Sequence, residues 1–234
     1  MKRISIICGL TFFLAMPALA TSIDFSTQEG SPFSWQLSSV GGSWQLSFVN
    51  DSVVVDSSSP SDAVLVGDHV NLPTMTLSNL TVVAPGVVMA TLTPTGNFTI
   101  QASAASGAVA AGDTVLTATV SPDSFVSSGT NFIAYSQIAK DLTIVSSASG
   151  YGTVIPQLAA NQAAGGSLDL SFSGDSTTDL FSMLTAAAMQ GTAVGDLSGQ
   201  STTTAPGVIP APGALLLTAV GTLLTGWLRR RTFI

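Results

Sequence analysis

Charged side chains are scarce in this 234-residue chain, and basic ones are the scarcest. Six Lys and Arg stand against 13 Asp and Glu, so the net charge is −7, and only 8% of residues are charged, against about 25% in an average soluble domain. Six bases are too few for the basic patch that neutralises nucleic-acid phosphates, which excludes a nucleic-acid partner. The single cysteine, Cys8, excludes a disulfide framework and a cysteine zinc site, and the single histidine, His69, excludes a site with several histidine ligands.

The first twenty residues have the three parts of a secretory signal peptide. Met1–Arg3 is a short basic start, Ile4–Met16 is an apolar run, and Ala18 and Ala20 supply the small side chains of an A-x-A cleavage site. A membrane anchor or a buried first helix is the alternative interpretation. Cleavage after residue 20 predicts a mature chain that starts at Thr21, contains no cysteine and has been exported.

The C-terminal segment predicts a membrane helix. Residues 213–228 are 16 uncharged residues, which span about 24 Å as a helix, slightly less than a hydrocarbon core of about 30 Å. Trp227 stands at the position of an interfacial anchor. Three arginines, whose transfer into lipid is costly, follow it and are expected to stay cytoplasmic and fix the orientation in the inner membrane: Arg229, Arg230 and Arg231.

Residues 209–234 together resemble the PEP-CTERM sorting signal of bacterial exported proteins. That signal combines a Pro-Glu-Pro motif, a membrane helix and an arginine-rich end. Here the motif is Pro210-Ala211-Pro212 followed by Gly213, with Ala211 where the family has Glu. The resemblance implies sorting by an exosortase-like membrane transpeptidase that cuts near the motif, and an association with exopolysaccharide and biofilm. It covers a tenth of the chain and concerns sorting, not the domain that is sorted.

Between these two ends the chain is long enough for one domain with a proper core. The part from residue 21 to 208 holds all 13 acids against the single base Lys140, which puts its net charge near −12. We expect a domain over residues 21–191. Residues 192–208 are rich in Gly, Ser and Thr and predict a flexible linker that holds the domain off the membrane.

Alternating apolar and polar residues predict β-strands across most of this domain. Phe33–Ser38 and Ser43–Phe48 both alternate, and Gly41-Gly42 lies between them, which predicts a β-hairpin. The tryptophans Trp35 and Trp44 are candidates for an aromatic carbohydrate platform, but they share their spacing with Leu and Phe, which favours a place in the core.

Further strands and two helices complete the predicted fold, a mainly β sandwich or jelly roll with one or two short helices. A helix is expected after the capping run Asp175–Asp179, with Gly191 as its stop, and a shorter one over Gln157–Ala164. The predicted strands are Val53–Asp56, Ala63–Val66, Thr74–Leu80, Val87–Leu92, Asn97–Ala102, Thr114–Val120, Leu142–Ser146 and Ser167–Ser173.

Few residues are candidates for a catalytic or metal-binding role. His69 is the only histidine for a Ser-His-Asp triad and lacks a Gly-x-Ser-x-Gly elbow, and Glu29 is the only glutamate, near the mature N-terminus. We therefore expect neither an enzyme nor a cofactor. Extracellular β-domains often bind calcium through aspartates, and two pairs are candidates for a structural calcium site: Asp51 with Asp56, and Asp62 with Asp68.

Three pairs of threonines offer a binding surface instead. Thr74-x-Thr76, Thr91-x-Thr93 and Thr117-x-Thr119 each place two hydroxyls on one strand face, about 6.7 Å apart. We expect an exported, membrane-sorted structural or adhesive protein of the envelope or extracellular matrix, associated with exopolysaccharide. The alternatives are a glycan- or ice-binding module that uses a threonine-rich face, and an Asp-dependent hydrolase.

Overall fold

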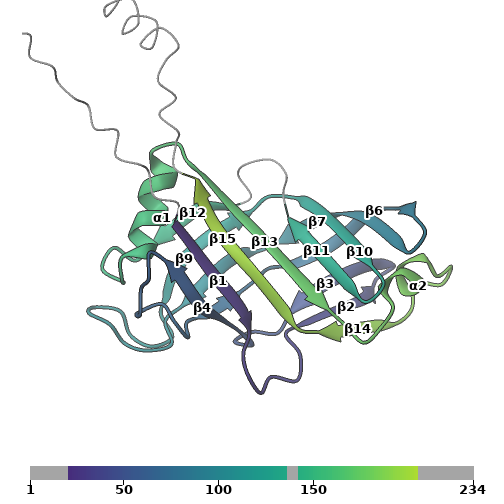
Figure 1. Ribbon diagram of the computed structural model, residues 1–234, viewed down its shortest axis with the longest axis horizontal. Helices are drawn as coiled ribbons and strands as arrows, with labels where there is room; N and C mark the ends of the chain where they lie inside the picture. Colours follow the sequence, from purple (N-terminus) through teal and green to yellow (C-terminus); the bar gives the residue numbers. More distant parts are fainter. Residues whose placement is uncertain (1–20, 136–141, 205–234) are drawn as a thin grey trace, which may run out of the picture. The chain divides into compact units, whose positions relative to one another are not determined.

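The computed structural model describes residues 21–135 and 142–204. These residues form one mainly β unit with two helices, which confirms the mainly β part of the predicted fold. Figure 1 shows the strands in chain order: β1 (Thr21–Thr27), β2 (Trp35–Val40), β3 (Ser43–Phe48), β4 (Val53–Ser59), β5 (His69–Asn71), β6 (Thr74–Ala84), β7 (Val87–Thr95), β8 (Asn97–Gln101), β9 (Thr114–Val120), β10 (Asp123–Ser128), β11 (Asn131–Tyr135), β12 (Leu142–Ser147), β13 (Ser167–Asp175), β14 (Thr192–Gly195) and β15 (Leu197–Thr204). The two helices are α1 (Val154–Ala163) and α2 (Leu180–Thr185).

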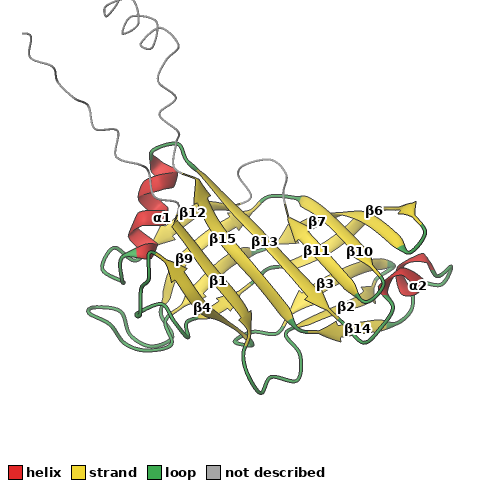
Figure 2. Ribbon diagram, viewed as in Figure 1, coloured by secondary structure: helices red, strands yellow, loops and turns green. Residues whose placement is uncertain are grey.

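All fifteen strands belong to one antiparallel sheet that curls around its own core (Figure 1). Their order is β12-β9-β8-β5-β4-β1-β15-β13-β11-β10-β7-β6-β3-β2-β14. Curling lets one face of every strand turn inward while the other stays in water, which is why the sequence alternates with period two. Helix α1 packs against β1, β12, β13 and β15 at one end, and α2 packs against β7 and β10 at the other (Figure 2).

Aromatic side chains fill the middle of the core. The ring of Trp35 meets that of Phe132 edge-on, with centroids 4.8 Å apart, and Phe125 stacks on Phe132 at 5.3 Å. Both Trp35 and Trp44 are buried, and the indole Nε1 of Trp35 donates to the carbonyl oxygen of Asp196 at 2.8 Å. The prediction that these tryptophans belong to the core, not to a carbohydrate platform, is therefore confirmed.

The predicted hairpin is present as β2 and β3, with Gly41 and Gly42 at positive φ in the turn. One predicted strand is wrong. Residues 63–66 form a turn, in which Leu65 N donates to Asp62 O and Asp68 N donates to Leu65 O. Leu65 is the one side chain of these four residues that is buried in the core. The other predicted strands lie within β4, β6, β7, β12 and β13, or match β8 and β9 to within a residue.

Both predicted helices exist, with different limits. Helix α1 starts at Val154, three residues before the predicted start. Helix α2 follows the predicted cap, because the side chain of Asp179 accepts from Phe181 N at 3.1 Å, but it ends at Thr185 instead of continuing toward Gly191.

The largest correction concerns the predicted linker over residues 192–208. Residues up to 204 form β14 and β15, and β15 lies in the sheet between β1 and β13. Its glycine has a packing role, because a Cβ on Gly199 would overlap the ring of Phe25. Small residues in β15 leave space for buried rings, which is why a central strand has the Gly- and Ser-rich composition that is typical of linkers. The domain therefore extends beyond the predicted end at residue 191.

Candidate functional site

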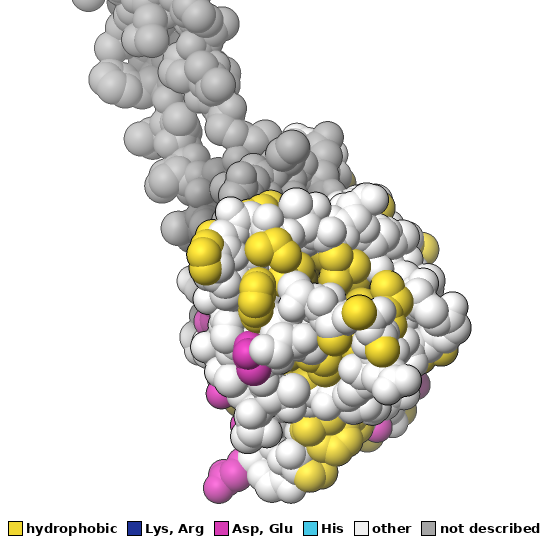
Figure 3. Space-filling model, turned by 90° about the vertical axis from the view of Figure 1, so that its right-hand side faces the viewer, with side chains coloured by type: hydrophobic (Ala, Val, Ile, Leu, Met, Phe, Trp, Pro, Cys, Tyr) yellow, Lys and Arg dark blue, Asp and Glu magenta, His cyan; other side chains and the backbone are white. Residues whose placement is uncertain are grey.

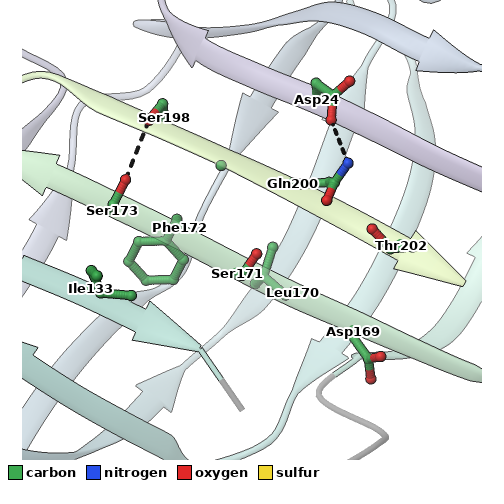
Figure 4. Close-up of a pocket in the computed structure, with 11 residues that line it drawn as sticks. Asp24, Ile133, Asp169, Leu170, Ser171, Phe172, Ser173, Ser198, Gln200 and Thr202 are labelled. Carbon is green, nitrogen blue, oxygen red and sulfur yellow. Dashed lines mark hydrogen bonds between the residues drawn. The ribbon is translucent and has the colours of Figure 1, made fainter. Parts of the chain in front are cut away.

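The strongest candidate site is a shallow groove on the outer, water-facing side of the sheet, over β1, β15, β13 and β11. It has a volume of about 740 Å³. We call it the β13–β15 groove. Figure 4 shows the side chains that define it: Asp24 of β1, Ser198, Gln200 and Thr202 of β15, Asp169, Ser171 and Ser173 of β13, and Ile133 of β11.

Strand alternation places these polar groups outside. On β13, Leu168, Leu170 and Phe172 are buried, so the residues between them face the groove. The antiparallel register then aligns groups from neighbouring strands, because Ser171 is the partner of Gln200 and Ser173 is the partner of Ser198. Neighbouring strands lie about 4.8 Å apart and successive outward residues about 6.7 Å apart, so the groove presents a regular array of hydroxyl and amide groups.

Hydrogen bonds hold part of this array in place. The Asp24 carboxylate accepts from Ser57 Oγ at 2.7 Å on one oxygen and from Gln200 Nε2 at 2.7 Å on the other (Figure 4). Ser173 and Ser198 share a hydrogen bond of 3.3 Å between their hydroxyls. The side-chain amide of Gln200 is therefore oriented by the Asp24 carboxylate, which Ser57 holds from the other side.

The groove continues into a second hollow of about 440 Å³. Ile133 and Ser173 line both, and Asn131, Asp175 and Asp196 extend the polar lining. The exposed side chain of Ile133 adds apolar surface between the hydroxyls. A surface that combines hydroxyls, an amide and an apolar side chain can contact both the polar groups and the C–H faces of a sugar chain.

The threonine pairs are divided between two parts of the sheet. Thr74-x-Thr76 and Thr91-x-Thr93 lie on the paired strands β6 and β7, where Thr76 is the partner of Thr93 and Thr91 is the partner of Ser78. Thr117-x-Thr119 lies on β9, on the far side of β1 in the strand order. The sequence therefore predicted one hydroxyl array from residues that form two.

The two calcium candidates Asp62 and Asp68 have structural hydrogen bonds instead. Asp62 comes from the loop before β5 and accepts, at the start of α1, from the backbone N of Thr153 and of Val154. Asp68 Oδ1 accepts from Ser103 N at 2.9 Å and from the Tyr151 hydroxyl at 2.9 Å. Among residues 21–135 and 142–204, no three His, Cys, Asp or Glu side chains gather in a way that could hold a metal ion.

The pKa values of Asp62 and Asp68 are shifted in opposite directions. Burial raises the pKa of Asp62, but the hydrogen bonds from Thr153, Val154 and Val64 outweigh it and leave that pKa below its usual value. Burial dominates at Asp68 and raises its pKa, despite hydrogen bonds from Ser103 and Tyr151. The pKa of the Tyr151 hydroxyl is raised too, by burial and by the neighbouring Asp68.

The remaining candidates lie apart. Asp51 is in the turn before β4 and Asp56 is exposed on β4 itself. His69 lies on β5, opposite Val54 and Gln101, and its buried Nδ1 has no hydrogen-bond partner in the structure. Glu29 lies exposed in the loop after β1.

Most of the predicted sorting residues lie outside the described part of the chain. The exception is Thr21, the predicted first mature residue, which begins β1 and whose backbone N donates to Thr203 Oγ1 at 3.3 Å. The others are Ala18 and Ala20 of the cleavage site, Pro210, Ala211, Pro212 and Gly213 of the sorting motif, and Trp227, Arg229, Arg230 and Arg231 at the end of the predicted 213–228 helix.

Comparison with known proteins adds no relative. No protein-family model, no curated protein and no solved structure matches this chain. Within the residues that the structure describes, neither helix is long and apolar enough to cross a membrane. The chain is thus placed by its fold as a mainly β protein with a curled antiparallel sheet, and its function rests on its own residues.

Proposed function

We propose that this chain is an exported, non-enzymatic structural or adhesive protein that contacts exopolysaccharide through the β13–β15 groove. In this proposal the curled sheet is a β-sandwich-like scaffold, and residues 209–234 sort the protein to the envelope as a PEP-CTERM-like signal. The observation that carries the proposal is the aligned array of Ser171, Ser173, Ser198 and Gln200, with the Gln200 amide held by Asp24.

The composition of the groove supports a neutral ligand with many hydroxyl groups. Its hydroxyls and amide both donate and accept hydrogen bonds, as the hydroxyls of a sugar chain do. Its acids would repel a strongly anionic polymer. Each hydrogen bond contributes about 0.5–1.5 kcal/mol. A polymer whose sugar units contact several groups of the groove at once is therefore a better ligand than a single sugar.

Binding of the mature chain to the exopolysaccharide of its own host tests this proposal. We expect Gln200→Ala to weaken retention on the immobilised polymer by roughly 2–10-fold, because one oriented amide is lost. Gln36→Ala is the matched control, since Gln36 lies half-buried on β2, away from the groove. Equal retention of both variants, or no retention of the unaltered chain at low salt, would contradict the proposal.

Sorting is tested separately. We expect replacement of Arg229, Arg230 and Arg231 by Ala to impair membrane retention or processing, because these charges hold the end of the helix in the cytoplasm. The mass of the mature protein shows whether the residues after Pro210 are removed. A variant that reaches the envelope at normal size and in normal amount would contradict the sorting proposal and leave the groove untouched.

A second candidate function rests on the ladder between β6 and β7. Thr74, Thr76 and Ser78 pair with Thr95, Thr93 and Thr91, which gives two adjacent rows of hydroxyls. Such rows are what a threonine-based glycan or ice face requires. This function would be favoured if the mature chain shapes ice or shows thermal hysteresis and if Thr76→Val and Thr93→Val abolish the effect. If the unaltered chain shows neither effect at high concentration, ice binding is excluded.

A further inference from the structure

The β6–β7 hairpin extends beyond the rest of the sheet (Figure 1). Strand β6 pairs with β3 only at Met75, Thr76 and Leu77, whereas its pairing with β7 continues to Ala84. In the described part of the chain, residues 78–84 therefore have a strand neighbour on one side only. The other side is an open edge, whose backbone N–H and C=O groups are a template for another strand.

Three side chains near the tip of this hairpin are apolar and exposed. Val82 is 54% exposed, Val83 is 51% exposed and Met89, on β7, is 39% exposed. No Asp, Glu, Lys or Arg occurs anywhere in residues 70–112. Figure 3 looks onto this end of the domain and shows apolar side chains gathered over it, with few acids.

The two outermost strands of the sheet are better protected than this edge. At β12, the side-chain amide of Gln162 donates to Leu142 O at 2.7 Å and accepts from Ile144 N at 2.7 Å, as a neighbouring strand would. At β14, which is only four residues long, Ser176 Oγ donates to Val194 O at 2.8 Å. Proteins protect edges by such coverage, by short strands, by charge or by bulges. Residues 78–84 have irregular pairing with β7 between Ser78 and Thr81 and between Val82 and Ala84, but they have no covering side chain among the described residues and no charge.

We propose that the open edge of β6, centred on Val82 and Val83, binds the same edge of a second copy of this chain. Two copies related by a twofold axis present the same edge in opposite directions, so antiparallel pairing is self-complementary. The proposal is independent of the glycan groove, because no residue of the groove takes part.

Charge makes this hairpin the part of the surface where two copies can meet most easily. The described residues carry twelve Asp and Glu and neither Lys nor Arg, so two copies repel each other over most of their surface. The uncharged hairpin is where this repulsion is weakest. A basic partner would gain more from the acids elsewhere, such as Asp175 and Asp196 at the groove, than from this edge.

The contact is small. One strand pairing of about six residues buries much less than the roughly 1,600 Å² of a standard stable complex. The association is therefore expected to be weak in dilute solution and to become effective when copies are concentrated on one surface.

Site-specific cross-linking of the full chain in detergent micelles tests this pairing. In a Cys8→Ser background, we expect Val83→Cys to cross-link between copies with a short bis-maleimide. Val145→Cys is the matched control, because Val145 is 62% exposed on β12, whose edge Gln162 covers. In separate variants without the introduced cysteines, Val83→Glu, which places like charges opposite each other, should weaken self-association measured by sedimentation roughly tenfold, whereas Val145→Glu should leave it unchanged.

Three outcomes would overturn the proposal. Equal cross-linking at Val83 and Val145 would show that the copies associate through another part of the chain. A chain that stays monomeric up to millimolar concentration would show that the edge has no affinity for itself. Cross-linking at Val83 only when another protein or the polysaccharide is added would assign the edge to that partner.

Discussion

Two buried carboxyls in one loop, Asp62 and Asp68, have pKa values shifted in opposite directions, because hydrogen bonds outweigh burial at Asp62 and burial outweighs hydrogen bonds at Asp68. Both are nearly inaccessible to water. Asp62 uses both oxygens, with donors from Thr153, Val154 and Val64, and its pKa falls. Asp68 leaves its buried Oδ2 without a partner, and its pKa rises. The pH dependence of stability should therefore have opposite signs at the two positions.

We expect Asp62→Ala to lower the free energy of unfolding by about 1–3 kcal/mol at neutral pH, because the N–H groups at the start of α1 lose their acceptor. The folded pKa is lowered, so this stabilisation is present above the unfolded pKa of about 3.9 and is lost as pH falls through the folded pKa. Urea unfolding between pH 2 and 7 measures it.

Asp56→Ala, at an exposed position on β4, serves as the control for charge removal and should change stability little. A loss in Asp62→Ala that persists unchanged at pH 2 would contradict the carboxylate role. Gly152 gives an independent check, because its φ is +57° and a Cβ there would overlap the Asp62 carboxylate. We expect Gly152→Ala to destabilise the domain as well.

Asp68→Asn should show the reverse slope. The folded pKa of Asp68 is raised, so its contribution to stability is fully present below the unfolded pKa of about 3.9 and is lost as pH rises through the folded pKa. The unaltered chain should therefore lose stability relative to Asp68→Asn between about pH 4 and neutral. A stability difference between the two chains that does not vary with pH in urea titrations would refute this prediction.

Among the elements, α1 matters because of what it does for the sheet. It is uncharged, and its buried Val154, Ile155 and Leu158 attach it to the core. The side-chain amide of its Gln162 makes two hydrogen bonds to the outer edge of β12, as the backbone of a neighbouring strand would. A helix thus closes an edge that would otherwise be open to another chain.

We expect Gln162→Ala to destabilise the domain by about 1–3 kcal/mol, because Leu142 O and Ile144 N lose their partner. The variant should also aggregate faster, because the β12 edge becomes available for pairing. Thermal unfolding and light scattering measure the two effects. Gln157→Ala on the exposed face of the same helix is the control, and an equal effect there would show that helix propensity, not edge coverage, is responsible.

For the domain as one body, the decisive feature is that its last strand lies between its first strand and β13. Thr21 and Thr203 are partners across β1 and β15, and Asn161 Nδ2 donates to both of their hydroxyls. The two ends of the described chain therefore leave side by side. After β15 ends at Thr204, only five residues precede Pro210, a span of about 17 Å when extended.

This topology predicts where the chain can be shortened. A 21–206 chain should fold, whereas a 21–191 chain should not, because losing β14 and β15 leaves β1 and β13 without a common neighbour. Near-ultraviolet circular dichroism and resistance to limited proteolysis distinguish the two. A folded 21–191 chain would show that the C-terminal strands are dispensable.

The groove was harder to predict than the fold. Alternation placed Trp35, Leu37, Trp44 and Leu46 in strands and in the core, because a one-residue shift would expose them. No local pattern marks the groove, since Asp24 and Gln200 meet across 176 positions of sequence. The polar run Ser-Gly-Gln-Ser-Thr-Thr-Thr over residues 198–204 was the available signal, and its composition made it resemble a linker.

Local sequence was sufficient for whatever depends on neighbours along the chain: the alternating strands, the Gly41-Gly42 turn, the Asp179 cap and an acidic domain almost without bases. Strand order, the central place of β15, the cover of Gln162 over β12 and the open edge of β6 depend on contacts between residues far apart in sequence. Those contacts are fixed by which surfaces the curled sheet buries together, and burial is a property of the assembled core that no single segment contains.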